Sequence, residues 1–243
     1  MSLSTRATVA ALVTSVCVVA LSGCALLPQK TFEETLDVEE EVTSVRFDGD
    51  SGSITVRGVE DQDVVTVHRE LRYRFDLPDE ETHRVSDGEL VLEDCGPQCS
   101  VSYTLEVPAG IPVSGSTTNG GLDLSALGEV DVETSNGRII LAEIDGSVRA
   151  STSNGRIEGR ELSGGEVDVE TSNGSIDLHS DGEQDVTART SNGSITLIVP
   201  EGDYRVDMET SNGRTESEVG SDQDAEVHLD LETSNGSISV VEE

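Results

Sequence analysis

The residues of this sequence with the most distinct chemical potential are two cysteines, Cys95 and Cys99, in the segment DCGPQCS. The Gly-Pro-Gln between them can make a tight turn that brings the two sulfur atoms into bonding range. A zinc site would need two further ligands, and the four histidines of the chain show no ligand spacing. We therefore expect a structural disulfide, with free thiols as the alternative, in preference to metal binding or redox catalysis.

Other catalytic constellations are absent from the sequence, which has no Gly-rich phosphate loop, no Ser-His-Asp spacing and no His-Glu cluster of the metalloenzyme type. Carboxylate pairs are frequent, but 49 acidic residues stand against 15 basic ones, so most pairs belong to a solvated acidic face. The net charge of -34 argues against nucleic-acid binding. Aromatic residues make up 2% of the chain, and any core must be thin and aliphatic.

The N-terminus has the form of a targeting signal. An apolar stretch over residues 7–20, too short to span a bilayer comfortably, is followed by the string LSGC, which ends at Cys24. This string resembles the lipobox of prokaryotic lipoproteins. The resemblance implies that residues 1–23 are a signal peptide that is removed and that Cys24 carries a lipid. An ordinary secretion signal that happens to contain a cysteine is the alternative.

A lipid on Cys24 would make the membrane a partner of this protein, because two acyl chains hold a soluble domain stably on a bilayer. Residues 24–41 are polar and acidic, and we expect them to form a tether. The protein is expected at the outer face of the cytoplasmic membrane or at the cell surface. An oxidising environment there favours the disulfide between Cys95 and Cys99.

Residues 111–243 repeat one polar string. Thr-Ser-Asn-Gly occurs six times and Thr-Thr-Asn-Gly once, at Asn-to-Asn intervals of 17 to 23 residues. Apolar residues stand six and four positions before most of these asparagines and three and five positions after them. This period-2 alternation predicts a strand, a corner and a strand in each unit. Corners are expected at Asn-Gly because both residues tolerate positive φ. The corner residues are Asn119, Gly120, Asn136, Gly137, Asn154, Gly155, Asn173, Gly174, Asn192, Gly193, Asn212, Gly213, Asn235 and Gly236.

Two all-β architectures fit this pattern. Asn-Gly between alternating strands is a strong signal for a two-residue hairpin and an antiparallel meander. The other candidate is a parallel β-solenoid in which each unit forms one coil. Stacking in register, about 4.8 Å apart, would place Arg149 between Asp131 and Asp168, a match that a meander would not use. It would also let each buried Thr hydroxyl bond its neighbours and the Asn side chains form a ladder. We favour the solenoid.

The same register predicts a patch of carboxylates near the C-terminus. Arg189 is expected between Glu170 and Glu209, whereas the last two repeats stack acid on acid without an intervening cation. The four carboxylates of this patch are Asp207, Glu209, Asp230 and Glu232. Each adjacent pair costs about 1 kcal/mol in water. A weak calcium or magnesium site is therefore a hypothesis, with simple solvated repulsion as the alternative; no other cofactor is expected.

Three stretches carry a resemblance to a known family: CSVSYTLEVPAGIPVSGSTTNGGLDL, the recurring V-x-V-x-T-S-N-G-x-I, and VPEGDYRVDMETSNG. They resemble the bacterial putative-adhesin family over residues 42–241, with Asn-Gly where that family commonly has Ser-Gly-Asp. The resemblance implies a right-handed, single-stranded parallel β-helix and supplies no catalytic residues.

The expected organisation is therefore a less regular β part, acting as a cap, over residues 42–110 and regular coils over residues 111–243. The expected function is a lipid-anchored adhesin or interaction scaffold without catalysis, which binds an envelope protein or a surface ligand. An accessory protein of envelope stress is one alternative, because some members of the family sit beside such systems. A β-helix that binds or cleaves polysaccharide is another, which the scarcity of aromatic and basic residues disfavours.

Overall fold

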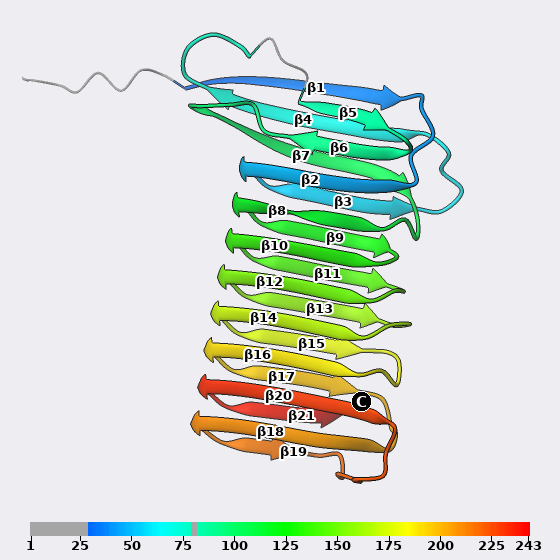
Figure 1. Cartoon of the computed structure of the whole chain (residues 1–243), viewed down its shortest axis with the longest axis vertical. Helices are drawn as coiled ribbons and strands as arrows, with labels where there is room; N and C mark the ends of the chain where they lie inside the picture. The colour runs from blue at the N-terminus through cyan, green and yellow to red at the C-terminus, as the bar shows by residue number, and fades with distance from the viewer. Residues whose placement is uncertain (1–28, 79–81) are drawn as a thin grey trace, which may run out of the picture.

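The computed structural model describes residues 29–78 and 82–243, so the predicted lipidation site, Cys24, and the predicted signal peptide lie outside the described residues. The described part of the chain is all-β, and its strands form two long sheets, one of eleven strands and one of ten. The sheets face each other along one column of stacked coils (Figure 1). The described residues include no helix of the length and hydropathy that crossing a membrane requires.

The N-terminal strands are β1 (Lys30–Val38), β2 (Ser44–Ser51), β3 (Ile54–Val59), β4 (Val65–Tyr73), β5 (His83–Ser86), β6 (Glu89–Glu93) and β7 (Cys99–Pro108). The regular coils contain β8 (Val113–Asn119), β9 (Leu122–Leu127), β10 (Val130–Asn136), β11 (Ile139–Ile144), β12 (Val148–Asn154), β13 (Ile157–Leu162), β14 (Val167–Asn173), β15 (Ile176–Ser180), β16 (Val186–Asn192), β17 (Ile195–Val199), β18 (Tyr204–Asn212), β19 (Thr215–Ser217), β20 (Val227–Asn235) and β21 (Ile238–Glu242).

Equivalent residues of neighbouring coils pair directly. Strand β10 runs parallel to β12 with Thr134 opposite Thr152 and Asn136 opposite Asn154, and β12 continues the same register to β14. The second sheet repeats this arrangement from β9 through β11 to β13. The repeat therefore forms the predicted parallel β-solenoid, and the antiparallel meander is excluded.

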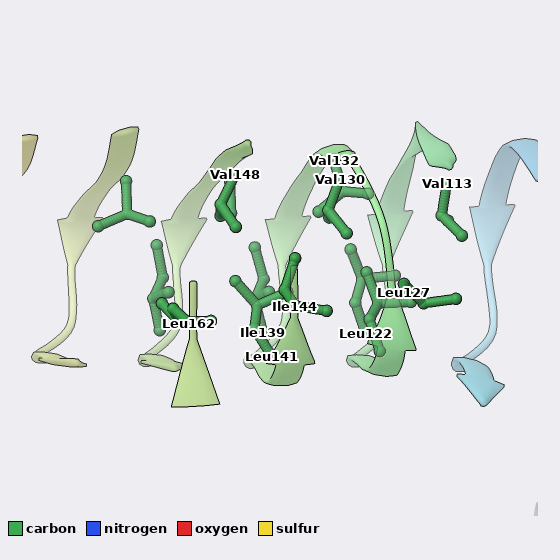
Figure 2. Packing of buried hydrophobic residues seen from close by; sticks show 14 of the residues in the cluster. Val113, Leu122, Leu127, Val130, Val132, Ile139, Leu141, Ile144, Val148 and Leu162 are labelled. Carbon is green, nitrogen blue, oxygen red and sulfur yellow. The ribbon is translucent and has the colours of Figure 1, made fainter. Parts of the chain in front are cut away.

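The core lies between the two sheets and is aliphatic, as the composition requires. In Figure 2 the valines of β10 point toward the isoleucines and leucine of β11, and Val130, Val132 and Ile139 are at most 2% exposed. Short branched side chains suit the narrow space between two sheets whose strands expose their other face to water. Gly159 stands at an inward position, and its missing side chain leaves the space that Leu162 and Leu178 occupy.

The glycine corners lie where the sequence predicted them, but the predicted reason is wrong. None of the seven corner asparagines has positive φ, and among the seven corner glycines only Gly236 does, with φ 157°. Glycine is needed because adjacent coils approach closely: a Cβ on Gly174 would lie 1.8 Å from the carbonyl oxygen of Gly155. Positive φ occurs instead before the opposite corners, at Ala126 and Glu143.

The order of the coils in space differs from their order in the chain at both ends. The coil of β2 and β3 lies between those of β6 with β7 and β8 with β9. At the other end, the coil of β20 and β21 lies between those of β16 with β17 and β18 with β19. Arg189 is therefore flanked by Glu170 and Glu232, and the prediction of Glu209 as its neighbour is wrong.

The inversion at the C-terminal end follows from the inward residues of the last two coils. Strand β19 carries Thr215 and Ser217 where other coils have apolar residues, and both are exposed. Strand β21 carries Ile238 and Val240, which are 1% and 0% exposed. The folded state has a lower free energy when the apolar coil is buried and the polar coil lies at the end of the column. The chain can pass back because the last repeat is longer, with an interval of 23 residues from Asn212 to Asn235.

The segment predicted to be an acidic tether contains a strand. Residues 30–38 form β1, which pairs antiparallel with β4 and covers the N-terminal end of one sheet. The less exposed members of the strand alternate with exposed ones and are Phe32, Glu34, Leu36 and Val38, of which Glu34 is paired with Arg69. The acidic residues Glu33, Glu34 and Asp37 among them obscured this alternation in the sequence.

We expect Gly174→Ala to destabilise the protein by about 3 kcal/mol or more, because the new methyl group meets a backbone carbonyl that cannot move without shifting a whole coil. The matched control is Gly220→Ala, whose Cβ would have no atom within 4 Å. Thermal or urea unfolding measures both. Equal stabilities of the two variants would contradict the close approach of the coils.

Candidate interaction surface

The hydroxyls of the corner threonines donate hydrogen bonds to backbone carbonyls of the adjacent coil. Thr152 Oγ1 donates to the Gly137 carbonyl at 3.1 Å, and Thr171 Oγ1 donates to the Gly155 carbonyl at 3.0 Å. The prediction that Thr hydroxyls bond each other along a column is wrong. The glycine carbonyl of the adjacent coil comes close because glycine has no Cβ, and it is a stronger acceptor than a neighbouring hydroxyl. The same bond to a glycine carbonyl satisfies the threonine of all six T-S-N-G corners.

The asparagines form the predicted ladder. Asn173 Nδ2 donates to Asn154 Oδ1 at 3.1 Å and to the Ser153 carbonyl at 3.3 Å, and the same pair of bonds recurs in neighbouring coils. Each of these amide nitrogens at the exposed corner therefore donates both to the neighbouring asparagine and to a serine carbonyl of the adjacent coil. The ladder holds the side chains in fixed positions along the edge of the solenoid.

The side chain of the serine in the T-S-N-G corner has no hydrogen-bonding role in the fold, although its carbonyl accepts a bond from the asparagine ladder. The hydroxyls of these six serines make no hydrogen bond to another described residue, and all but the first are exposed. They are Ser135, Ser153, Ser172, Ser191, Ser211 and Ser234. We name this row the serine ridge. It presents uncharged hydroxyls at the strand spacing of about 4.8 Å on a strongly acidic protein.

Charged residues form columns beside the serine ridge. Arg149 lies between Asp131 and Asp168, as predicted, with 3.4 Å from Arg149 Nη1 to Asp168 Oδ2. Arg189 is paired with Asp230, and its Nε lies 3.8 Å from a carboxylate oxygen of Glu232. The arginines relieve repulsion between carboxylates in neighbouring coils.

Three of the four carboxylates of the predicted patch are paired with protein side chains, and Glu209 has no ion pair with a described residue. Asp207 stacks on Asp230 and Glu209 on Glu232, as expected. However, the inverted coil order brings Arg189 to this pair of strands, and His228 Nε2 lies 2.8 Å from Asp207 Oδ2. Within residues 29–78 and 82–243, no group of three or more Asp, Glu, His or Cys side chains is arranged to hold a metal ion.

An arginine cluster on the second sheet has no counterpart in the sequence analysis. Arg138 and Arg156, at successive corners, both donate to the Glu158 carboxylate, whose side chain is 11% exposed. The hydrogen bond from Arg138 is the main cause that lowers the pKa of Glu158, and Arg156 adds to it. The spacing of 18 residues between the arginines is the repeat interval, which could have identified the pair.

Cys95 and Cys99 form a disulfide with their Cα atoms 5.6 Å apart, in the turn between β6 and β7. The carboxylate of Asp94 accepts a hydrogen bond from the Gly96 amide at 2.9 Å within this turn. The disulfide closes a short surface turn at the N-terminal end of the solenoid.

The described residues contain no arrangement of catalytic groups. Burial raises the pKa of Tyr103 to about 12, but its hydroxyl donates to the backbone carbonyl of Glu93 at 2.8 Å and is structural. An open groove of about 540 Å³ crosses the corners opposite the serine ridge. Its lining includes Arg57, Glu143, Glu161 and Asp181, which are separate charges without a paired nucleophile and base.

These features define the class of the protein as a parallel β-solenoid whose corners expose a ladder of amides and a row of hydroxyls. The chain belongs to the Toastrack DUF4097 family, whose model matches residues 36–241. No curated protein is significantly similar in sequence.

Several solved structures are similar to this chain. A putative adhesin from Bacteroides fragilis is 13% identical, with a TM-score of 0.52, and the match covers 86% of this chain and 97% of that one, which supports the fold. A putative adhesin from Parabacteroides merdae is 13% identical, with a TM-score of 0.47 and coverage of 87% and 96%. A putative cell adhesion protein from Clostridium sporogenes is 16% identical, with a TM-score of 0.40 and coverage of 88% and 100%.

We expect Arg189→Ala to destabilise the protein by about 1 kcal/mol, because it leaves Asp230 and Glu232 beside other carboxylates without a cation. Salt at about 0.5 M should recover part of this loss by screening. Arg214→Ala, which removes an exposed arginine without an ion pair to a described residue, is the control. Thermal melts at low and high salt measure the effect; a loss that salt does not reduce would contradict an electrostatic role.

We expect Glu158→Gln to lower stability by about 1 kcal/mol at pH 7. Since the folded pKa of Glu158 is lowered, its contribution is present above the ordinary carboxyl pKa of about 4.3 and is lost as pH falls through the folded value. The difference between wild type and variant should therefore vanish at acid pH. Glu133→Gln, at an exposed position without an ion pair to a described residue, is the control. Urea unfolding of both variants and wild type from neutral to acid pH measures the effect. A difference that persists below the folded pKa would contradict pairing of Glu158 with the arginine cluster.

Proposed function

We propose that this protein is a lipid-anchored, extracytoplasmic interaction scaffold that acts as an adhesin without catalysis. The observation that carries the proposal is the serine ridge: the repeat retains an exposed hydroxyl that has no role inside the fold. A stacked solenoid holds such groups rigidly and in register, so a partner can bind many of them at a small entropic cost.

The chemistry of the surface indicates the kind of partner. The net charge of -34 disfavours nucleic acid and other polyanions, while the ridge offers uncharged hydrogen-bonding groups. An envelope protein or a neutral surface ligand fits these conditions. The name of the Bacteroides fragilis structure agrees with an adhesive role, although at 13% identity the likeness supports the fold alone.

The anchor is proposed from the LSGC string that ends at Cys24. A lipid there would place the solenoid at the outer face of the cytoplasmic membrane or at the cell surface. This location also agrees with the disulfide between Cys95 and Cys99, because disulfides persist in oxidising compartments.

The interaction role is tested by capture from the protein's own envelope with the lipidated full chain as bait. We expect wild type to retain a partner that the double variant Ser172→Arg, Ser191→Arg loses by about tenfold, because the bulky charges interrupt the ridge at its centre. Thr196→Arg with Ser239→Arg places the same charges on the outer face of the other sheet and serves as the control. Equal capture by both double variants would show that the ridge is not the binding surface.

The anchor predicts that Cys24→Ser abolishes lipidation and releases the protein from the membrane fraction. Fractionation followed by detergent extraction measures this, and mass spectrometry of the mature N-terminus reports the lipid. A membrane pool of the variant that is unchanged and still needs detergent would exclude lipid anchoring at Cys24.

A further inference from the structure

The length of chain between Cys24 and β1 limits how far the solenoid can lie from a membrane that holds Cys24. Only five residues separate Cys24 from Lys30, the first residue of β1, because half of the expected tether, residues 30–38, is part of the sheet. An extended chain of this length spans at most about 20 Å. If Cys24 carries a lipid, as the proposed function states, the N-terminal end of the solenoid must lie close to the bilayer surface.

The surface at this end differs from the rest of the protein. Phe75 and Leu77 are 54% and 39% exposed, and they are two of the three large apolar side chains that the described residues expose. They follow β4, and Lys30 Nζ donates to the Phe75 carbonyl at 2.7 Å, which holds this segment beside the start of β1. In Figure 1 the start of β1 and the end of β4 lie at the end of the column that is opposite β18 and β19.

Cations accompany these apolar residues. Arg72 is paired with Glu70 but its side chain is 57% exposed, and Arg74 makes no ion pair with a described residue. Asp76 lies in the same segment, and Asp79, Glu80 and Glu81 follow it in the sequence, so the cations stand beside carboxylates and the segment has no net positive charge. We name Lys30, Arg72, Arg74, Phe75 and Leu77 the basal patch. Exposed aromatic and aliphatic groups beside cations suit the interface of a bilayer that contains anionic lipids.

We propose that the basal patch contacts an anionic lipid surface and holds the solenoid end-on to the membrane. Phe75 and Leu77 enter the interfacial region, while Lys30, Arg72 and Arg74 face the phosphate groups of the lipids. A solenoid lying on its side would place its acidic columns against those phosphates. Standing on its end moves most of these columns beyond the screening distance of about 8 Å at physiological salt.

The absence of Trp from the chain gives this proposal a sensitive test, because Phe75→Trp introduces the only indole. The lipidated full-length variant is bound to vesicles of phosphatidylcholine and phosphatidylglycerol, prepared with and without brominated acyl chains. We expect a blue shift of the emission on binding and quenching by the brominated lipid. Lys30→Ser, Arg72→Ser and Arg74→Ser together in this background should reduce the quenching, and so should replacing phosphatidylglycerol with phosphatidylcholine.

Ser211→Trp, at an exposed corner of the terminal coil at the opposite end of the column, is the matched control and should show neither effect. Vesicle flotation of the same samples separates the two proposals. If the protein floats with the vesicles but the Phe75→Trp variant is quenched no more than the control variant, the end-on contact is contradicted. The lipid anchor is then still supported. If the protein does not float with the vesicles, both the lipid anchor and the end-on contact are contradicted.

Discussion

The structure depends on the close approach of successive coils at their corners. Each corner glycine lies so near the glycine carbonyl of the adjacent coil that no side chain fits, as the 1.9 Å from a Cβ on Gly155 to the Gly137 carbonyl oxygen illustrates. This contact fixes the register, and the register determines the rest: threonines reach the glycine carbonyls, asparagines form a ladder, and inward positions align into apolar columns. A polar repeat thus encodes a fold with few aromatic residues, because its stability comes from satisfied backbone and side-chain hydrogen bonds as well as from burial.

Much of this architecture was predictable from one sequence. The alternation around each Asn-Gly identified the strands and inward residues, and the position of Arg149 between two aspartates distinguished parallel stacking from hairpins. The reason for glycine at the corner was not predictable from the sequence, because positive φ and close approach of two backbones both favour glycine. Nor was the coil order obvious, since sequential stacking is the simplest assumption; the polar residues Thr215 and Ser217 were the signal that this coil ends the column. The inversion in turn decides that Arg189 neutralises Asp230, which weakens the case for a cation site there.

The serine hydroxyls of the corners and the two ends of the column have features that the fold does not require. Threonine, asparagine and glycine of the corner each have a structural partner, whereas the serine hydroxyl has none among the described residues. The two ends of the column also differ: one carries exposed apolar and cationic residues next to the start of β1, and the other ends in a polar coil. A scaffold that stands on a membrane by its first coils and displays a regular edge along its length accounts for both features.

Amide hydrogen exchange of the corner glycines measures whether the corners are stacked in register. The Gly155 amide donates to the Asn173 carbonyl at 3.1 Å and the Gly174 amide to the Asn192 carbonyl at 3.0 Å. We predict that both amides, resolved by NMR, exchange only through global unfolding, as do the amides of the buried strands. Exchange of these glycine amides at the rate of an exposed hairpin turn would contradict the stacked solenoid.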